Sequence, residues 1–430
     1  MFGTSGVRGP VGETVTAELA LEIGRALGVD TERVVVGRDA RESGRAMVDA
    51  LAAGLCESGT DVVDIGLAAT PTLARAVGWM DADAGVAVTA SHNPPADNGI
   101  KLWQPSGQAF DAAGRERIAE RVEAGETALA AWDGFGERTA GEAGNRHREA
   151  LVGAVTLDRE LSVVVDIGNG VGGVTADALG DLGCAVETLN AQPDGAFPGR
   201  PSEPTATHCE SLATLVAETD ADLGVAHDGD GDRMRAVDET GQFLSGDVLL
   251  AVFGREAARA GERVAVPVDT SLAVEDHLAA AGIDTVRTPV GDVYVAAAAS
   301  ESGVAFGGEP SGAWIWPDES LCPDGPLAAC RLAALAAERP LSERAGAVET
   351  YPLRRTSVEV EQREATMATV RERADRYEAV TTLDGVRVER GDAWFLVRAG
   401  GTEPVVRITA EARDPDRLDD VFTEARRLLR

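Results

Sequence analysis

The sequence predicts an α/β protein with mostly parallel sheets, arranged as three similar α/β units followed by a smaller α+β unit. Short runs rich in Val and Ile alternate with alanine-rich stretches of helical length, which is typical of β-α-β units. At roughly 100–200 residues per domain, a chain of 430 residues also predicts two to four domains.

The first unit shows this alternation most clearly. Residues 33–37, 61–65 and 84–89 are predicted strands because β-branched and small apolar residues fill them, and residues 43–55 are a predicted helix. The same rhythm restarts at residues 161–166 and again at 263–268. Each restart follows a stretch that is polar, acidic or rich in Gly and Pro, so it marks the beginning of another unit.

The last stretch follows a different pattern. Residues 386–390 and 393–397 form two predicted strands joined by Gly391-Asp392, which indicates a β-hairpin. A third strand at 405–409 and a helix from about residue 415 complete the α+β unit. We expect boundaries near residues 150, 245 and 350, which divide the chain into 1–150, 151–245, 246–350 and 351–430.

The charge of the chain restricts its partners. The net charge is −32, with 72 acidic residues spread along the sequence and no basic block of the kind that nucleic-acid binders carry. We therefore expect no nucleic-acid partner. Lysine has nearly vanished, which favours a halophilic surface whose self-repulsion is screened by salt. An acidic protein from an ordinary environment is the alternative.

The sequence also indicates where the protein works. No apolar run of about 18 residues or more is present, so we expect no membrane span. The first eight residues lack the apolar core of a signal peptide. The five cysteines are scattered without a C-x-x-C pair, which fits a reducing cytoplasm and argues against zinc or a disulfide framework.

The strongest motif combines TASHNPP at residues 89–95 with DNGIK at 97–101. Ser91 follows a predicted strand, at the carboxyl end where α/β sheets bind ligands. A serine becomes a useful nucleophile only when it is activated or held phosphorylated. Lys101 is the only lysine in the chain and can stabilise phosphoryl oxygens or move a proton, which arginine cannot do equally well. An ordinary Asn-Pro turn with a lysine retained by chance is the alternative.

A second motif, HDGDGDR, occupies residues 227–233. Three carboxylates at a spacing of two, separated by glycines, can converge on one hard cation such as Mg²⁺. A solvated acidic loop is one alternative. An EF-hand is another, but its glycine position holds Arg233 and a strand, not a helix, precedes the motif.

Two glycine-rich loops lie further along the chain. GGEPSG at 307–312 offers Glu309 and Ser311, whose side chains can hold neighbouring sugar hydroxyls. RAGGTEP at 398–404 exposes backbone N–H groups that can form an anion nest, and Arg398 or Arg407 can add a bidentate contact to phosphate. Plain turns explain either loop when it is taken alone.

A further pattern supports a rival function. GNGVGG at 168–173 follows a predicted strand, and Glu187 lies about twenty residues on, as in the dinucleotide fingerprint. This pattern predicts an NAD-dependent dehydrogenase. A tight strand-to-helix turn is the simpler explanation, because a dehydrogenase leaves the other four motifs unexplained.

Taken in order, the motifs resemble the α-D-phosphohexomutase superfamily over essentially the whole chain, from FGTSGVRG at 2–9 to GTEP at 401–404. The resemblance implies three α/β domains with mixed sheets and a smaller α+β C-terminal domain around a central cleft. In chain order, the four predicted segments would carry the phosphoserine, the metal, the sugar and the phosphate that is not transferred.

The resemblance also implies roles for single residues. Ser91 would be phosphorylated and would hold one Mg²⁺ per chain together with Asp228, Asp230 and Asp232. Other catalytic candidates flank the reacting oxygens: Arg8 and Lys101 for acid–base work, and His92 in the serine loop. The substrate-binding candidates are Arg233, Glu309, Ser311, Arg398, Gly400, Gly401, Thr402 and Arg407.

The implied reaction has two phosphoryl transfers. The phosphoserine gives its phosphate to the free end of a sugar monophosphate, and the resulting sugar 1,6-bisphosphate turns around and returns its other phosphate. This bisphosphate is both intermediate and activator, and the partners are small-molecule sugar phosphates. The sequence does not fix the oligomeric state or the resting phosphorylation of Ser91.

Finer features favour one subgroup. DNGIK and VGDVYV at 290–295 look like phosphoglucosamine mutases, and GEPSGAW at 308–314 looks like their archaeal branch. Two positions depart from many relatives, since Ala313 stands where a histidine is common and Gly400 where a serine is common. We therefore expect glucosamine 6-phosphate and glucosamine 1-phosphate as substrates. A phosphomannomutase/phosphoglucomutase and a non-catalytic sugar-phosphate binder are the alternatives.

Overall fold

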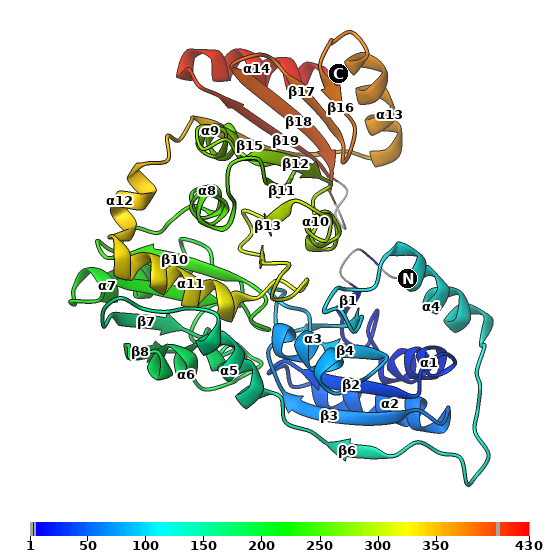
Figure 1. The fold of residues 1–430 in the computed structure, drawn as a ribbon. Coiled ribbons are helices and arrows are strands. Elements are labelled where there is room, and N and C mark those ends of the chain that lie inside the picture. Colours follow the sequence, from blue (N-terminus) through cyan, green and yellow to red (C-terminus); the bar gives the residue numbers. More distant parts are fainter. Residues whose placement is uncertain (1–2, 4–5, 401–404, 430) are drawn as a thin grey trace. The chain divides into compact units, whose positions relative to one another are not determined.

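The computed structural model describes residues 3, 6–400 and 405–429. These residues fall into two compact units. The first comprises Met1–Gly246 with Ser311–Ala345, and the second comprises Asp247–Pro310 with Gly346–Arg430. Three parallel or mixed sheets with helices precede one antiparallel sheet along the chain (Figure 1), which confirms the predicted fold class.

The first sheet of the first unit is mixed and has six strands in the order β1-β5-β4-β2-β3-β6. Strands β4, β2, β3 and β6 are parallel, and β5 is antiparallel to both β4 and β1. The strands are β1 (Val7–Pro10), β2 (Arg33–Arg38), β3 (Asp61–Leu67), β4 (Ala84–Val88), β5 (Asp97–Trp103) and β6 (Arg138–Ala140). The helices are α1 (Ala17–Gly28), α2 (Gly44–Glu57), α3 (Thr70–Trp79) and α4 (Ala112–Ala124).

Strand β2 shows why this sheet is buried on both faces. Successive side chains of a strand point to opposite faces. Val34 and Val36 pack into the cluster that contains residues of α1 and α2, whereas Val35 packs into the cluster that contains residues of α3. All three valines are 0% exposed, as expected for a parallel strand covered by helices on both sides.

The second sheet has the order β10-β9-β7-β8, with only β10 antiparallel to its neighbour. Its strands are β7 (Ser162–Asp166), β8 (Ala185–Leu189), β9 (Leu223–His227) and β10 (Met234–Asp238), and its helices are α5 (Gly144–Gly153), α6 (Val174–Asp181) and α7 (Glu210–Ala217). Residues 311–345 contain α11 (Gly325–Glu338), most of α12 (Leu341–Gly346) and β14 (Trp314–Ile315), which is the last strand of the third sheet, of order β12-β11-β13-β14. Helix α11 packs on α5, α6, β9 and β10, so by its contacts this segment lies in the first unit.

The second unit contains one parallel and one antiparallel sheet. In the parallel sheet β11 (Arg263–Pro267) lies between β12 (Asp284–Thr288) and β13 (Val304–Gly308), accompanied by α8 (Gly246–Ala257), α9 (Leu272–Ala279) and α10 (Asp292–Ala299). The second sheet of this unit has the order β15-β19-β18-β17-β16 and is fully antiparallel. Its strands are β15 (Leu353–Glu359), β16 (Val380–Thr381), β17 (Val386–Glu389), β18 (Ala393–Ala399) and β19 (Val405–Ala412).

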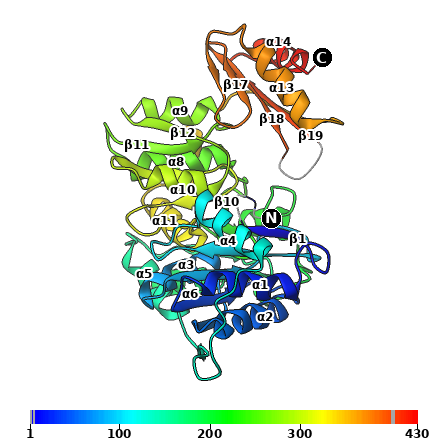
Figure 2. The ribbon, with the colours of Figure 1, turned by 90° about the vertical axis from the view of Figure 1, so that its right-hand side faces the viewer.

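Two helices, α13 (Arg363–Ala374) and α14 (Pro415–Arg427), cover one face of the antiparallel sheet (Figure 2). The predicted hairpin is confirmed as β17 and β18, and the predicted third strand as β19. Within the described ranges, no helix has both the length and the apolar character that crossing a bilayer requires.

Candidate active site

Ser91 lies directly beyond the carboxyl end of β4, in a segment of residues 89–97 that we call the serine loop. Its backbone adopts a φ of 51°, in the left-handed region that non-glycine residues rarely occupy. The residue is 1% exposed, and its Oγ donates a hydrogen bond of 2.5 Å to Asp228 Oδ2. A strained backbone that aims one buried hydroxyl at a carboxylate is a feature of functional sites.

The metal loop, residues 228–232, forms the turn between β9 and β10. Asp228, Asp230 and Asp232 are 1%, 0% and 4% exposed, and one oxygen from each lies within 4.8 Å of the others. Asp230 Oδ1 is buried without a hydrogen-bond partner among the described residues. Burial and the charges of Asp232 and Asp230 raise the pKa of Asp228 well above its usual value. Converging carboxylates with one unsatisfied oxygen fit a hard divalent cation.

Lys101 extends from β5 into the same site. Its Nζ lies 2.9 Å from Asp230 Oδ2 and 2.8 Å from Asp232 Oδ2. Burial by itself raises the pKa of Asp230, but the charge of Lys101 and its hydrogen bond lower it below the usual range. The only lysine of the chain is therefore paired with two of the three predicted metal ligands.

Thr70, at the start of α3, is a contact that the sequence analysis did not identify. Its Oγ1 donates to Asp230 Oδ2 at 2.8 Å, and its backbone N donates to Asp230 O at 2.8 Å. Two contacts from one residue fix both the side chain and the backbone of the middle aspartate. The sequence could have indicated Thr70 only by its position, because it follows the carboxyl end of strand β3, where ligand-binding residues gather.

Three further candidates lie around this centre. Arg8 on β1 donates from NH1 to Asn93 Oδ1 at 3.2 Å, and the backbone N of Arg233 donates to Asp228 Oδ1 at 3.2 Å. His92 Nδ1 is 3.3 Å from Ser91 Oγ. Burial, together with Arg233, Arg8 and Lys101, lowers the pKa of His92 to about 2. A pKa this low favours the neutral imidazole, which can position Ser91 through Nδ1.

The predicted sugar loop is divided between the two units. Ser311 belongs to the first unit, where Gly312 O accepts from Met234 N at 3.0 Å and Ala313 forms a β-bridge with Arg233. The residues after Ser311 thus lie beside the strand that leaves the metal loop. Glu309 belongs to the second unit, where its Oε1 accepts from Gly291 N at 2.7 Å.

The predicted phosphate loop lies in the second unit. Arg398 on β18 and Arg407 on β19 are direct cross-strand partners, and Arg398 NH1 is 3.3 Å from Asp384 Oδ2. Gly400 O accepts from Arg363 NH1 at 2.8 Å. Gly401 and Thr402 lie outside the described residues.

Three glycines of the dinucleotide-like motif allow close packing. A Cβ on Gly170 would lie 2.6 Å from Gly229 O, and a Cβ on Gly168 would lie 2.5 Å from the guanidinium of Arg200. A Cβ on Gly172 would lie 3.0 Å from the ring of His227. These three glycines leave room for the metal loop, for His227 and for Arg200, whereas a Cβ on Gly173 would meet nothing within 4 Å, so close packing is the simpler explanation for most of the pattern.

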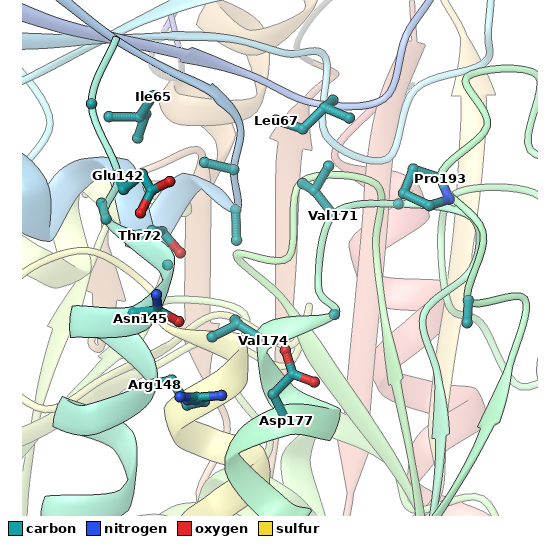
Figure 3. A pocket seen from close by; sticks show the side chains of 18 residues that line it. Ile65, Leu67, Thr72, Glu142, Asn145, Arg148, Val171, Val174, Asp177 and Pro193 are labelled. Carbon is teal, nitrogen blue, oxygen red and sulfur yellow. The ribbon is translucent and has the colours of Figure 1, made fainter.

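A pocket of about 450 Å³ lies between the starts of α3, α5 and α6 (Figure 3). None of the predicted site residues lines it. Its wall includes Val171, whose backbone N donates to Gly229 O at 3.2 Å. The segment that lines the pocket therefore also contacts the metal loop through this hydrogen bond.

Known sequences and family profiles match the chain along nearly its whole length. Sequence profiles described as phosphoglucomutase/phosphomannomutase alpha/beta/alpha domains I, II and III match residues 1–129, 146–241 and 245–351, and the profile of the C-terminal domain matches 356–428. A "probable phosphoglucosamine mutase" of Methanosarcina acetivorans is 44% identical, covering 100% of this chain and 99% of the relative. Another from Methanopyrus kandleri is 46% identical over 98% of this chain and 96% of the relative.

Solved structures show the same similarity. A phosphoglucomutase/phosphomannomutase family protein from Burkholderia thailandensis has a TM-score of 0.88 and 29% identity, covering 100% of this chain and 98% of that one. An N-acetylphosphoglucosamine mutase of Aspergillus fumigatus, solved with GlcNAc-6P and magnesium, has a TM-score of 0.60 and 18% identity, covering 93% of this chain and 82% of that one. At this identity, the second similarity concerns the fold alone.

Proposed function

The chain belongs to the phosphoglucomutase/phosphomannomutase family, and on this premise we propose that it interconverts glucosamine 6-phosphate and glucosamine 1-phosphate through a phosphoserine at Ser91. As a hexose phosphate mutase it is an intramolecular phosphotransferase, similar to the phosphoglucosamine mutases of archaea. The observation that carries the proposal is the 2.5 Å contact between Ser91 Oγ and Asp228 Oδ2.

The proposed site uses the residues that surround this contact. Ser91, Asp228, Asp230 and Asp232 would hold one Mg²⁺ per chain, which would neutralise charge on the phosphoryl group during transfer. The supporting observations are the convergence of the three carboxylates and the unsatisfied Asp230 Oδ1. These residues fit a cation that prefers oxygen ligands and keeps positions for phosphate.

The proposed reaction balances over two transfers. First, the bond between Ser91 Oγ and phosphorus breaks, and a bond forms from phosphorus to the free hydroxyl of the sugar monophosphate. After the bisphosphate reorients, its other phosphate returns to Ser91 Oγ and leaves the isomeric monophosphate. In the first transfer the sugar hydroxyl loses its proton and Ser91 Oγ gains one; in the second, Ser91 Oγ loses its proton and the departing sugar oxygen gains one, with Lys101 and Arg8 as the candidate carriers.

The remaining candidates would bind the substrate. Glu309 and Ser311 would contact sugar hydroxyls, and Arg398, Gly400, Gly401, Thr402 and Arg407 would hold the phosphate that is not being transferred. Arg398 and Arg407 are direct cross-strand partners, so both side chains project from the same face of the sheet, where bidentate contacts to one phosphate would be available. Excluding water would keep the phosphoserine from hydrolysis.

The preferred sugar can be tested with a substrate panel. We expect kcat/KM for glucosamine 6-phosphate to exceed that for mannose 6-phosphate and glucose 6-phosphate by about tenfold or more, because one contact to a distinguishing polar group contributes on that scale. The assay needs a sugar 1,6-bisphosphate activator and high salt, as the net charge of −32 requires screening.

The panel separates the alternatives. Highest kcat/KM with mannose or glucose phosphate would assign the chain to the phosphomannomutase/phosphoglucomutase type. Binding of every sugar phosphate without turnover would favour a non-catalytic binder. Measuring NADH binding by fluorescence in the same samples checks the dehydrogenase alternative, for which we expect no signal.

A further inference from the structure

Arg41, in the turn between β2 and α2, is an arginine of the first unit that belongs to none of the sequence motifs. It is 0% exposed, and its Nε donates to Asp39 Oδ2 at 3.0 Å. Asp39 also accepts from the backbone N of Arg41 at 3.0 Å and from Thr89 Oγ1 at 2.7 Å. These contacts fix the guanidinium at one place beside the serine loop.

The two terminal nitrogens of Arg41 gather the backbone of the serine loop. NH2 donates to Ser91 O at 2.9 Å and to Asn93 O at 2.6 Å. NH1 donates to Pro94 O at 2.5 Å and to Asp97 O at 2.8 Å. Together with Nε, all five N–H donors of the guanidinium are in use.

The guanidinium of Arg41 satisfies backbone carbonyls of the serine loop that would otherwise be buried without hydrogen bonds. Four carbonyls of an irregular segment converge on one buried place, where each needs a hydrogen-bond donor. A single planar guanidinium supplies all four bonds, which also fixes the relative positions of the four residues. One of these carbonyls belongs to Ser91, whose backbone is held at a φ of 51°.

Ser202 lies in the long connection between β8 and α7, next to the second sheet, and contacts the same carbonyl. Its Oγ donates to Ser91 O at 2.8 Å and accepts from Gly229 N at 3.0 Å. Ser202, a residue that is 3% exposed, thereby links the serine loop to the metal loop through its hydroxyl. The fit is close, because a Cβ on Gly229 would lie 2.7 Å from Ser202 Oγ and 2.8 Å from Ser91 O.

We propose that Arg41 and Ser202 are positioning residues that clamp the carbonyl of Ser91 and thereby set the distance between the reacting hydroxyl and the metal loop. The proposal rests on the proposed function of Ser91. Arg41 maintains the shape of the serine loop, and Ser202 couples that loop to the metal ligands. A displacement of about 1 Å between reacting groups can reduce a rate about 100-fold, so both contacts affect kcat more than substrate binding.

The test compares Arg41→Lys and Ser202→Ala with wild type in the full-length protein at high salt. Arg41→Lys keeps the charge beside Asp39 but cannot serve four carbonyls, so we expect kcat to fall about 100-fold. For Ser202→Ala we expect kcat to fall about tenfold and the half-saturating Mg²⁺ concentration to rise several-fold, since outer contacts tune metal affinity on this scale. KM should stay within about twofold in both variants.

Ser320→Ala is the matched control. Ser320 is a buried serine of the same unit whose Oγ accepts from Cys322 N at 3.1 Å. We expect wild-type kcat and Mg²⁺ response from this variant, and calorimetric Mg²⁺ binding gives a readout independent of turnover. If Arg41→Lys does not fold, the kcat and Mg²⁺ response of Ser202→Ala alone test the proposed clamp.

Two results would overturn the clamp. One is a wild-type kcat and Mg²⁺ response in Ser202→Ala and in any folded Arg41→Lys. The other is a loss of rate that only follows the loss of folded protein. Ser91→Ala in the same assay separates the two claims: if it is inactive while the clamp variants behave as wild type, only the clamp fails, whereas an active Ser91→Ala removes the proposed function as well.

Discussion

Replacing Ser91 by alanine is expected to abolish mutase turnover, by at least about 10³-fold, while the protein stays folded. The reason is chemical, because the phosphate then has no oxygen to leave from or return to. The structural cost is small: the residue loses one hydrogen bond to Asp228, and alanine meets the same steric limits as serine at a φ of 51°.

Intact mass and thermal unfolding check this expectation. The wild-type protein purified from cells should carry a partial phosphate adduct, and Ser91→Ala should carry none. Ser106→Ala, at an exposed serine of the same unit, serves as control and should keep both activity and adduct. Substantial mutase activity in a folded Ser91→Ala variant would refute the assignment of Ser91.

Replacing Asp230 by asparagine is expected to weaken the Mg²⁺ response and to reduce the rate together, each by about 100-fold. Asparagine has nearly the same shape, so the change removes charge and little volume. It leaves Lys101 with only Asp232 of its two carboxylate partners, and it removes the anionic character of the unsatisfied Oδ1. The variant should therefore bind Mg²⁺ poorly at concentrations that saturate wild type.

Asp238→Asn is a matched control in the same hairpin. Asp238 lies at the far end of β10 and is 3% exposed, and its Oδ1 accepts from Thr240 and Gln242, a role that asparagine can keep. Titrations of Mg²⁺ by activity and by calorimetry should leave this control unchanged. A Mg²⁺ titration of Asp230→Asn that matches wild type would count against the metal loop.

Local patterns predicted the elements that carry the chemistry. The apolar run beginning at residue 33 became β2, and the hairpin at Gly391-Asp392 became β17 and β18. The two strand ends that hold Ser91 and Asp228 were also identified, because each motif directly follows an apolar run. Such features depend on neighbouring residues, which periodicity and turn chemistry describe well.

Contacts between distant segments could not be predicted in this way. Thr70 and Asp230 are separated by 160 residues, and Ser202 and Ser91 by 111. Single hydroxyl and guanidinium groups leave no periodic signal, so Thr70, Arg41 and Ser202 were all missed. The packing of α11 on β9 and β10 was missed as well, because the apolar face of a helix carries no information about which element packs against it.

The most direct test of the central claim is to follow a labelled phosphate on Ser91 during turnover. Protein labelled at Ser91 is mixed with excess unlabelled sugar monophosphate, and the label is measured in the Ser91 peptide and in the sugars. We expect the peptide to lose its label as fast as the sugar isomerises, with the label appearing first in the sugar bisphosphate. Isomerisation that proceeds while Ser91 keeps its label would contradict the account.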